Sequence, residues 1–210
     1  MRGAVFDIDG TVLDSMTIWY DLTVRFFKRN NVKISDEENL YYQSMTFEET
    51  LPLIQEKHLP HLTFEGMLAE LKSLAEYAYK YEIPPKDGVC EYIKKLHADG
   101  IKIAVATSGF SELCRAALER IGILHCIDAF AFSAETGCSK GEPDIYLLAA
   151  KRLGLSPSEC EVYEDLITGI KSAKSAGFST TAIYDSTNEH LTKELKESAD
   201  RYITTWNELF

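Results

Sequence analysis

Short apolar runs alternate with amphipathic stretches along the second half of the chain, and this alternation limits its fold more than any other feature. With the run that opens the chain, the predicted strands are 4–6, 101–106, 127–132, 160–163, 178–183 and 202–203. The predicted helices between them are 89–98, 111–121, 142–153 and 167–176. Strands that alternate with helices form a parallel sheet, because each connection must cross over the sheet. We therefore predict an α/β fold with a doubly wound, Rossmann-like parallel sheet.

Residues 16–83 differ from the rest of the chain, because they show helical periodicity and no convincing strand. The first helical face combines Trp19, Leu22, Phe26 and Phe27. A later stripe, interpreted most simply as core, consists of Phe64, Met67, Leu68, Leu71, Leu74, Ala75, Ala78 and Tyr81. Capping-box sequences that begin at Ser35 and Thr46 predict two helix starts. We expect an all-helical domain at 16–83, inserted into a core domain of residues 1–15 and 84–210.

Composition excludes several classes of partner. A chain of 210 residues fits one domain, or one domain with a modest insertion. Its net charge of -11 argues against nucleic acid or an anionic membrane as a main partner. No apolar stretch approaches the ~20 residues of a membrane span, and the chain opens directly on a strand, so we expect no signal peptide. The five cysteines contain no C-x-x-C pair, which favours reduced thiols in a cytoplasmic protein, with a monomer as the default.

Two carboxylates, Asp7 and Asp9, follow the first strand, and Thr11 adds a hydroxyl. Ligands bind at the carboxyl ends of the strands in an open parallel sheet. Strand alternation places Asp7 and Asp9 on one side, where two carboxylates repel unless they share a cation or a proton. This arrangement suits phosphoryl transfer, with one carboxylate as nucleophile, the second as acid/base and Mg²⁺ between them. D-x-D-G alone is equally a turn signal, so the rest of the chain must decide.

Three further polar clusters follow predicted strands. Thr107 and Ser108 can donate to phosphoryl oxygens, although a helix-capping turn is the simpler explanation of these two residues taken alone. Lys140 lies just before a predicted helix, where an ammonium can neutralise nearby anions, but it could equally be a surface lysine. Glu164 and Asp165 are adjacent acids at a strand end, an unfavourable pair unless a cation or a donor compensates them.

The four clusters resemble, in order, the four motifs of the haloacid dehalogenase (HAD) superfamily of phosphotransferases. F-D-x-D-G-T-x-x-D-S from Phe6 looks like the first motif, and the hydroxyl of Thr107 matches the second. K-x-x-P-D-I-Y from Lys140 resembles the lysine motif, and Y-E-D from Tyr163 resembles the acidic fourth motif. The matches extend over the whole predicted core. The chain is therefore identified as a member of this superfamily.

The resemblance implies a mechanism. Asp7 is expected to attack phosphorus and form an aspartyl-phosphate, while Asp9 protonates the leaving oxygen and then deprotonates the attacking water. The dehalogenases of the superfamily lack this second acid, so the presence of Asp9 argues against dehalogenation. Mg²⁺ is expected on the Asp7 carboxylate, the Asp9 backbone carbonyl and Asp165, with Glu164 acting directly or through a water.

The phosphoryl oxygens are expected on Thr107, the backbone N–H of Ser108 and the ammonium of Lys140. Two positions depart from the family pattern. Gly141 stands where the family often has proline, which loosens the lysine loop without removing its charge. Leu166 stands where the family usually has serine, which bears on supporting hydrogen bonds more than on metal ligation.

The helical insertion resembles the cap of the branch that contains phosphoglycolate phosphatase and β-phosphoglucomutase. A cap of this kind closes over the active site and contacts the substrate. By position, the turn with Gln43, Ser44 and Thr46 resembles the cap loop that reaches the leaving group, although an ordinary helix-capping turn explains it equally well.

The leading hypothesis is a Mg²⁺-dependent phosphatase of a small phosphorylated metabolite, with a sugar or polyol phosphate as the expected class. A β-phosphoglucomutase-like phosphomutase is the alternative. Such mutases carry a histidine early in the first cap helix, and residues 14–20 contain none, which favours hydrolysis. A catalytically dead fold used as a binding module would have lost Asp7, Asp9 or Lys140, and all three are present.

Overall fold

The computed structural model describes residues 1–43 and 47–210, without the side chains of residues 19, 40, 43 and 47–49. The chain divides into two compact units: Met1–Ser15 with Ile83–Phe210, and Met16–Glu82. This boundary differs by one residue from the expected one, because Ile83 is fully buried and belongs to the first unit. Within the described ranges, no helix is both long and apolar enough to cross a membrane.

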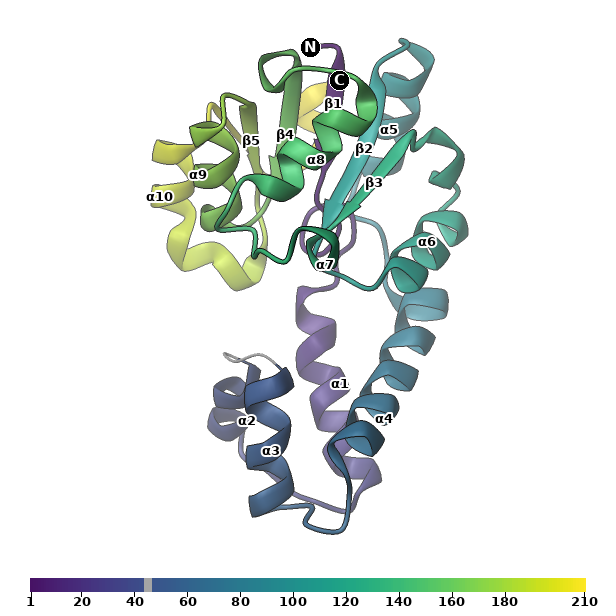
Figure 1. The fold of residues 1–210 in the computed structure, drawn as a ribbon, viewed down its shortest axis with the longest axis vertical. Helices are drawn as coiled ribbons and strands as arrows, with labels where there is room; N and C mark the ends of the chain where they lie inside the picture. Colours follow the sequence, from purple (N-terminus) through teal and green to yellow (C-terminus); the bar gives the residue numbers. More distant parts are fainter. Residues whose placement is uncertain (44–46) are drawn as a thin grey trace. The chain divides into compact units, whose positions relative to one another are not determined.

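The first unit is built on a six-stranded sheet in the order β3-β2-β1-β4-β5-β6, with every neighbouring pair parallel (Figure 1). The strands are β1 Gly3–Phe6, β2 Lys102–Thr107, β3 Ala129–Phe132, β4 Cys160–Glu164, β5 Ser179–Ile183 and β6 Arg201–Ile203. The predicted Rossmann-like fold is confirmed. The chain builds outward from β1 to β3 in one direction and from β4 to β6 in the other, so the strand order reverses between β1 and β4. This switch point is where doubly wound sheets bind ligands, at the carboxyl ends of the strands.

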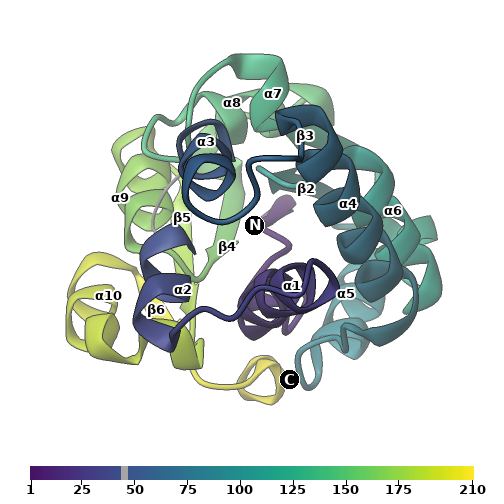
Figure 2. The same ribbon diagram turned by 90° about the horizontal axis from the view of Figure 1, so that it is seen from below.

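Helices cover both faces of the sheet, as Figure 2 shows in the perpendicular view. The helices of this unit are α5 Val89–Ala98, α6 Ser111–Arg120, α7 Ser133–Thr136, α8 Asp144–Leu153, α9 Ile167–Ser175 and α10 Thr192–Ser198. Helices α8 and α9 pack on one face, over a buried cluster to which Val5 of β1 and Val162 of β4 belong. The other face carries an aromatic cluster in which Phe6 stacks on Tyr163 at 4.6 Å between ring centroids. Neighbouring positions of β1 and β4 thus face opposite layers, as strand alternation requires.

The predicted strand at 127–132 begins later than expected. Leu124–Cys126 form a 3₁₀ turn, and β3 starts at Ala129. Asp128 ends the irregular segment, because its carboxylate accepts a hydrogen bond from Ile103 N at 2.7 Å beside the strand. An acidic side chain that bonds the neighbouring backbone favours a turn over the regular ladder.

The second unit is helical throughout its described residues, with α1 Met16–Arg29, α2 Asp36–Gln43, α3 Phe47–Lys57 and α4 Phe64–Tyr77. Leu22, Phe26 and Phe27 of α1 are buried, as predicted. The helix start predicted at Ser35 is confirmed, because Ser35 Oγ accepts a hydrogen bond from Glu38 N at 3.1 Å, while the Glu38 carboxylate accepts from Lys57 at 2.6 Å. The box expected at Thr46 lies outside the described residues.

The later apolar stripe is correct as far as Ala78 and wrong at Tyr81. A π-helical turn, Ala78–Glu82, follows α4 and shifts the periodicity. It buries Tyr79 and leaves Tyr81 68% exposed. The wider turn adds a residue per turn relative to the α-helix, so a stripe extrapolated at the α-helical period points to the wrong side.

Candidate active site

The site begins where β1 and β4 end, at the switch point of the sheet. The two strands are in register at Phe6 and Tyr163, and Asp7 N donates to Tyr163 O at 3.0 Å. Since alternation continues through the strand ends, Asp7 lies on the same face as Val5, and Glu164 on the same face as Val162. Both carboxylates therefore emerge on the side covered by α8 and α9. Each is buried, with Asp7 2% and Glu164 0% exposed.

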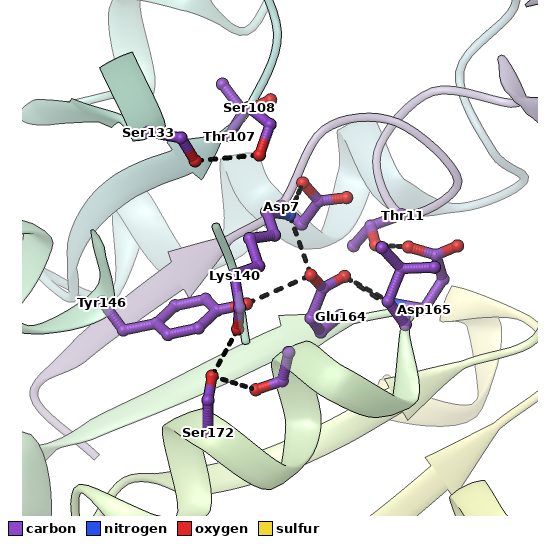
Figure 3. Close-up of polar contacts among 12 residues, drawn as sticks. Asp7, Thr11, Thr107, Ser108, Ser133, Lys140, Tyr146, Glu164, Asp165 and Ser172 are labelled. Carbon is purple, nitrogen blue, oxygen red and sulfur yellow. Dashed lines mark hydrogen bonds and ion pairs between the residues drawn. The ribbon is translucent and has the colours of Figure 1, made fainter. Parts of the chain in front are cut away.

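Lys140 supplies the counter-charge for this pair, from the segment that precedes α8. Its ammonium donates to Asp7 Oδ1 and, at 2.8 Å, to Glu164 Oε1 (Figure 3). The lysine is itself only 8% exposed. One ammonium thus bridges two carboxylates from two adjacent strand ends.

The electrostatics of the cluster show an excess of negative charge. Burial, the neighbouring Glu164 and Asp9 raise the pKa of Asp7 to about 7, although Lys140 opposes that shift. Burial and Glu164 likewise raise the pKa of Asp165 well above its ordinary value. Burial alone would lower the pKa of Lys140, but Asp7 and Glu164 raise it well above the ordinary lysine value, so the ammonium stays charged.

Three carboxylates can share one metal ion. Oxygen atoms of Asp7, Glu164 and Asp165 lie within 4.8 Å of one another, and all three residues are buried. Their three negative charges face the one positive charge of Lys140, so a divalent cation would balance the set. Clustered carboxylate oxygens are the ligands that Mg²⁺ prefers. The residues present therefore fit the expected metal.

Asp165 is held in place by two polar side chains. Asn188 Nδ2 donates to Asp165 Oδ2 at 3.0 Å, and Thr11 Oγ1 lies 3.4 Å from Asp165 Oδ1. Hydrogen bonds to a ligating carboxylate fix its orientation toward a metal. Thr11 was noted in the sequence as a hydroxyl near the first acids, whereas nothing in the sequence marked Asn188.

Asp9 lies beyond the regular part of the strand, in the turn that follows it. Regular strand structure ends at Phe6, and the following turn folds back through the Leu13 N to Ile8 O hydrogen bond at 2.8 Å. The Asp9 carboxylate accepts a hydrogen bond from Ser15 Oγ at 2.7 Å. It is not one of the carboxylates that cluster within 4.8 Å in the described part of the chain. The Asp9 carboxylate thus has a hydrogen-bond partner of its own, while its charge still raises the pKa of Asp7.

The end of β2 lies beside Asp9. A Cβ atom added at Gly109 would lie 3.3 Å from Asp9 Oδ2 and 3.3 Å from Thr107 Oγ1, so these two oxygens flank the same turn. Thr107 is buried, and its Oγ1 accepts a hydrogen bond from Gly109 N at 3.0 Å. Ser108 is exposed, and its Oγ lies 2.8 Å from Ser133 Oγ (Figure 3).

Two residues behind the carboxylates escaped the sequence analysis. Tyr146 of α8 donates from its hydroxyl to Glu164 Oε1 at 3.1 Å, the same oxygen that Lys140 bonds. Gly169 of α9 allows this approach, because a Cβ there would lie 2.5 Å from both Glu164 Oε1 and the Tyr146 hydroxyl. Tyr146 is the last residue of the lysine motif quoted above, and Gly169 follows the acidic motif by four residues, which was the available signal. The motifs alone do not say that the tyrosine and the glycine meet at one oxygen.

The expected cap-loop contacts cannot be compared with the structure. Ser44 and Thr46 lie outside the described residues, and Gln43 is described only as the last residue of α2.

Comparison with known proteins gives the same family over most of the chain. A family model of haloacid dehalogenase-like hydrolases matches residues 1–177. A phosphorylated carbohydrates phosphatase of Thermotoga maritima is 24% identical over 177 residues, which cover 84% of this chain and 82% of that protein. Hexitol phosphatase A of Escherichia coli is 29% identical over 185 residues, covering 87% of this chain and 82% of the relative.

A solved structure shares the fold. CbbY from Rhodobacter sphaeroides, crystallised in complex with phosphate, superposes with a TM-score of 0.82 at 22% identity. The match covers 100% of this chain and 96% of that one, so it includes the helical insertion as well as the sheet.

Proposed function

We propose that this chain, which belongs to the family of haloacid dehalogenase-like hydrolases, is a Mg²⁺-dependent phosphatase that hydrolyses small phosphorylated metabolites, with sugar or polyol phosphates as its substrate class. The observation that carries the proposal is the ammonium of Lys140 bridging Asp7 and Glu164 at the switch point of the sheet. The substrate class is supported by relatives named as phosphatases of phosphorylated carbohydrates and of hexitols.

Asp7 is the proposed nucleophile. Its carboxylate oxygen attacks phosphorus, the bond between phosphorus and the ester oxygen breaks, and an aspartyl-phosphate forms. Asp9 gives its proton to the departing oxygen, so that the metabolite leaves as an alcohol. In the second step Asp9 takes a proton from water, the water oxygen attacks phosphorus, and Asp7 is regenerated as inorganic phosphate leaves. The Ser15 hydroxyl, which donates to Asp9 Oδ1 at 2.7 Å, suits the second role because it fixes the orientation of this carboxyl group.

The phosphoryl oxygens are proposed to lie against Thr107, the backbone N–H of Ser108 and Lys140. The transition state of phosphoryl transfer is loose, with its charge spread over three oxygens, so catalysis depends on positioning and on charge neutralisation. Lys140 has two roles in the reaction: it favours the ionised form of Asp7 and offsets the charge of the incoming phosphate.

Mg²⁺ is proposed to be held by the carboxylates of Asp7 and Asp165 and the backbone carbonyl of Asp9, with Glu164 acting directly or through a water. When bound, the ion neutralises charge on the phosphoryl oxygens. The protein's contribution is the rigid set of carboxylates, which Lys140 alone leaves undercompensated.

The helical unit, Met16–Glu82, is proposed as a cap that excludes water and supplies substrate contacts, with Gln43, Ser44 and Thr46 as candidates. A monomer in the cytoplasm is the accompanying proposal. The five cysteines are all free, which suits a reducing compartment.

Phosphate release from a panel of metabolites tests the proposal. The panel contains hexose and pentose phosphates, hexitol phosphates, phosphoglycolate, glycerol phosphate and nucleoside monophosphates, each with Mg²⁺ and with EDTA. Release from sugar or polyol phosphates, abolished by EDTA and by Asp7→Asn but kept by Asp99→Asn, is expected. Asp99 is a matched control, because it is an exposed carboxylate paired with Lys95. Conversion of one sugar phosphate isomer into another would instead establish the phosphomutase, and no turnover of any compound would contradict the proposed substrate class.

A further inference from the structure

The segment that carries Lys140 is irregular and contains a flexible residue next to the lysine. Residues 139–143 run between α7 and α8 as turns, held locally by the Glu142 N to Ser139 O hydrogen bond at 3.1 Å. Gly141 does not have a positive φ, and a Cβ added there would meet only Ser139 Oγ at an ordinary 3.4 Å. Glycine is therefore not required by the geometry, and its conformational freedom has to be overcome when the segment is ordered.

One side chain anchors this segment from another element. The hydroxyl of Ser172, in α9, lies 2.6 Å from the backbone carbonyl oxygen of Lys140 and 3.2 Å from Gly169 O (Figure 3). A serine hydroxyl has one proton to donate, and the shorter contact identifies the Lys140 carbonyl as its main acceptor. Ser172 is 5% exposed, so water does not readily replace this bond.

The Ser172 hydroxyl is the hydrogen-bond donor to this carbonyl from a distant part of the sequence. In the described part of the chain, no backbone N–H donates to Lys140 O. Serine is a poorer helix former than alanine, and a serine inside a helix usually bonds its own preceding turn or faces solvent. The main hydrogen bond of Ser172 goes neither to its own helix nor to solvent, but to the segment that precedes α8. The Ser172 hydroxyl thus fixes the backbone of Lys140, while Asp7 and Glu164 fix its ammonium group.

We propose that Ser172 is a positioning residue for Lys140: its hydroxyl holds the backbone from which the lysine reaches the reacting carboxylate. The expected effect on kcat rests on the proposed phosphatase function. The expected effect on the placement of Lys140 rests only on the hydrogen bond. It assigns to α9 a role in the placement of the lysine, in addition to its packing role against β4 and β5. The anchor compensates for the freedom that Gly141 brings to the segment.

Four variants test the kinetic consequence. Ser172→Ala removes the hydroxyl and is expected to lower kcat roughly tenfold, because a buried acceptor loses its donor and a small displacement of a catalytic group is costly. Ser172→Thr and Ser172→Val have nearly the same shape and differ in the hydroxyl, so the threonine variant is expected to exceed the valine variant severalfold in kcat. Ser175→Ala is the matched control, since its hydroxyl donates only to Ser172 O within the same helix, and it is expected to keep wild-type kcat. Equal losses in the threonine and valine variants, or unchanged kcat in Ser172→Ala, would overturn the proposal.

A spectroscopic arm separates this proposal from the proposed function. In protein labelled with ¹⁵N-lysine, the buried Lys140 ammonium should give a slowly exchanging signal, assigned by its loss in Lys140→Arg. The signal is expected to broaden or to exchange faster in Ser172→Ala and to persist in Ser175→Ala. An inactive wild type in which Ser172→Ala still alters the signal would overturn the phosphatase function and leave the positioning role standing. An active wild type in which Ser172→Ala changes neither kcat nor the signal would overturn the positioning role alone.

Discussion

The metal-free protein is expected to become less stable as the pH rises, because the pKa values of Asp7 and Asp165 are both raised in the folded state, and the Asp7 contribution can be worked out. The pKa of Asp7 is raised from 3.8 to about 7 by burial, by Glu164 and by Asp9. The folded protein therefore retains a proton that the unfolded chain has already released. Because the folded state binds more protons in this window, its stability falls from about pH 4 to about pH 7. A difference of about three pKa units corresponds to about 4 kcal/mol, at ~1.4 kcal/mol per unit.

Asp7→Asn removes this titration while it keeps an oxygen that can accept from Lys140. In EDTA, the variant is therefore expected to gain stability relative to the wild type as the pH rises, by about 4 kcal/mol between pH 4 and pH 8. For a domain of this size, that corresponds to a relative shift in Tm of roughly 8–16 °C. Added Mg²⁺ should make the wild type more stable than the variant at pH 8, because the ion binds the folded wild type, whereas the variant lacks one of the metal ligands.

Thermal unfolding followed by circular dichroism at several pH values, with EDTA and with Mg²⁺, measures this difference. Asp99→Asn serves as the control, because its carboxylate is exposed and lies outside the cluster, so its curve should run parallel to that of the wild type. A wild type and an Asp7→Asn variant whose Tm values stay parallel over the whole pH range in EDTA would refute the reasoning that burial and charge crowding govern Asp7.

Four further substitutions probe the surroundings of the cluster. Lys140→Met leaves two buried carboxylates without their counter-ion and should lower the free energy of unfolding in EDTA by about 3–5 kcal/mol, measured by urea denaturation, with a smaller loss in Mg²⁺. Gly169→Ala places a Cβ 2.5 Å from Glu164 Oε1 and should cost about 1–3 kcal/mol, whereas Gly141→Ala, with its ordinary contact, should leave Tm unchanged or slightly raised. Tyr146→Phe removes a donor from the same oxygen and should lower the free energy of unfolding by about 1 kcal/mol; no change in its urea midpoint would show that the hydrogen bond contributes nothing.

The sheet and the core acids were accessible from the sequence because their signals are local. A short apolar run followed by acids identifies a strand and its carboxyl end, and the crossover rule then brings these ends together without any knowledge of side-chain geometry. The meeting of Asp7 and Glu164 follows from that rule, whereas Lys140 lies between α7 and α8 and was expected there only from the resemblance of its motif. The position of the Asp9 carboxylate does not follow from the rule, because alternation stops after Asp7 and the turn from Ile8 to Leu13 decides where the side chain points.

Contacts that depend on helix rotation could not be predicted. Ser172 reaches the Lys140 carbonyl only because α9 presents that face to the lysine segment, and Tyr146 reaches Glu164 only because Gly169 leaves space. The apolar stripe of the helical unit failed at Tyr81 for a related reason. Tyr81 lies inside the π-turn Ala78–Glu82, where the spacing of the side chains differs from that of an α-helix, and the presence of this turn is not visible in the hydrophobic pattern.

The most direct test of the proposed mechanism is the detection of the phosphoryl group on Asp7. Asp9→Asn lacks the base for the second step, so it should accumulate the intermediate. The substrate is p-nitrophenyl phosphate, supplied with Mg²⁺, because its p-nitrophenolate leaving group needs no proton in the first step. After acid quenching, mass spectrometry should show one added phosphoryl group per chain, labile to hydroxylamine and located on the peptide that contains Asp7. The double variant with Asp7→Asn should remain unmodified. An unmodified Asp9→Asn protein, or a phosphoryl group on a peptide without Asp7, would contradict the assignment of Asp7 as the nucleophile.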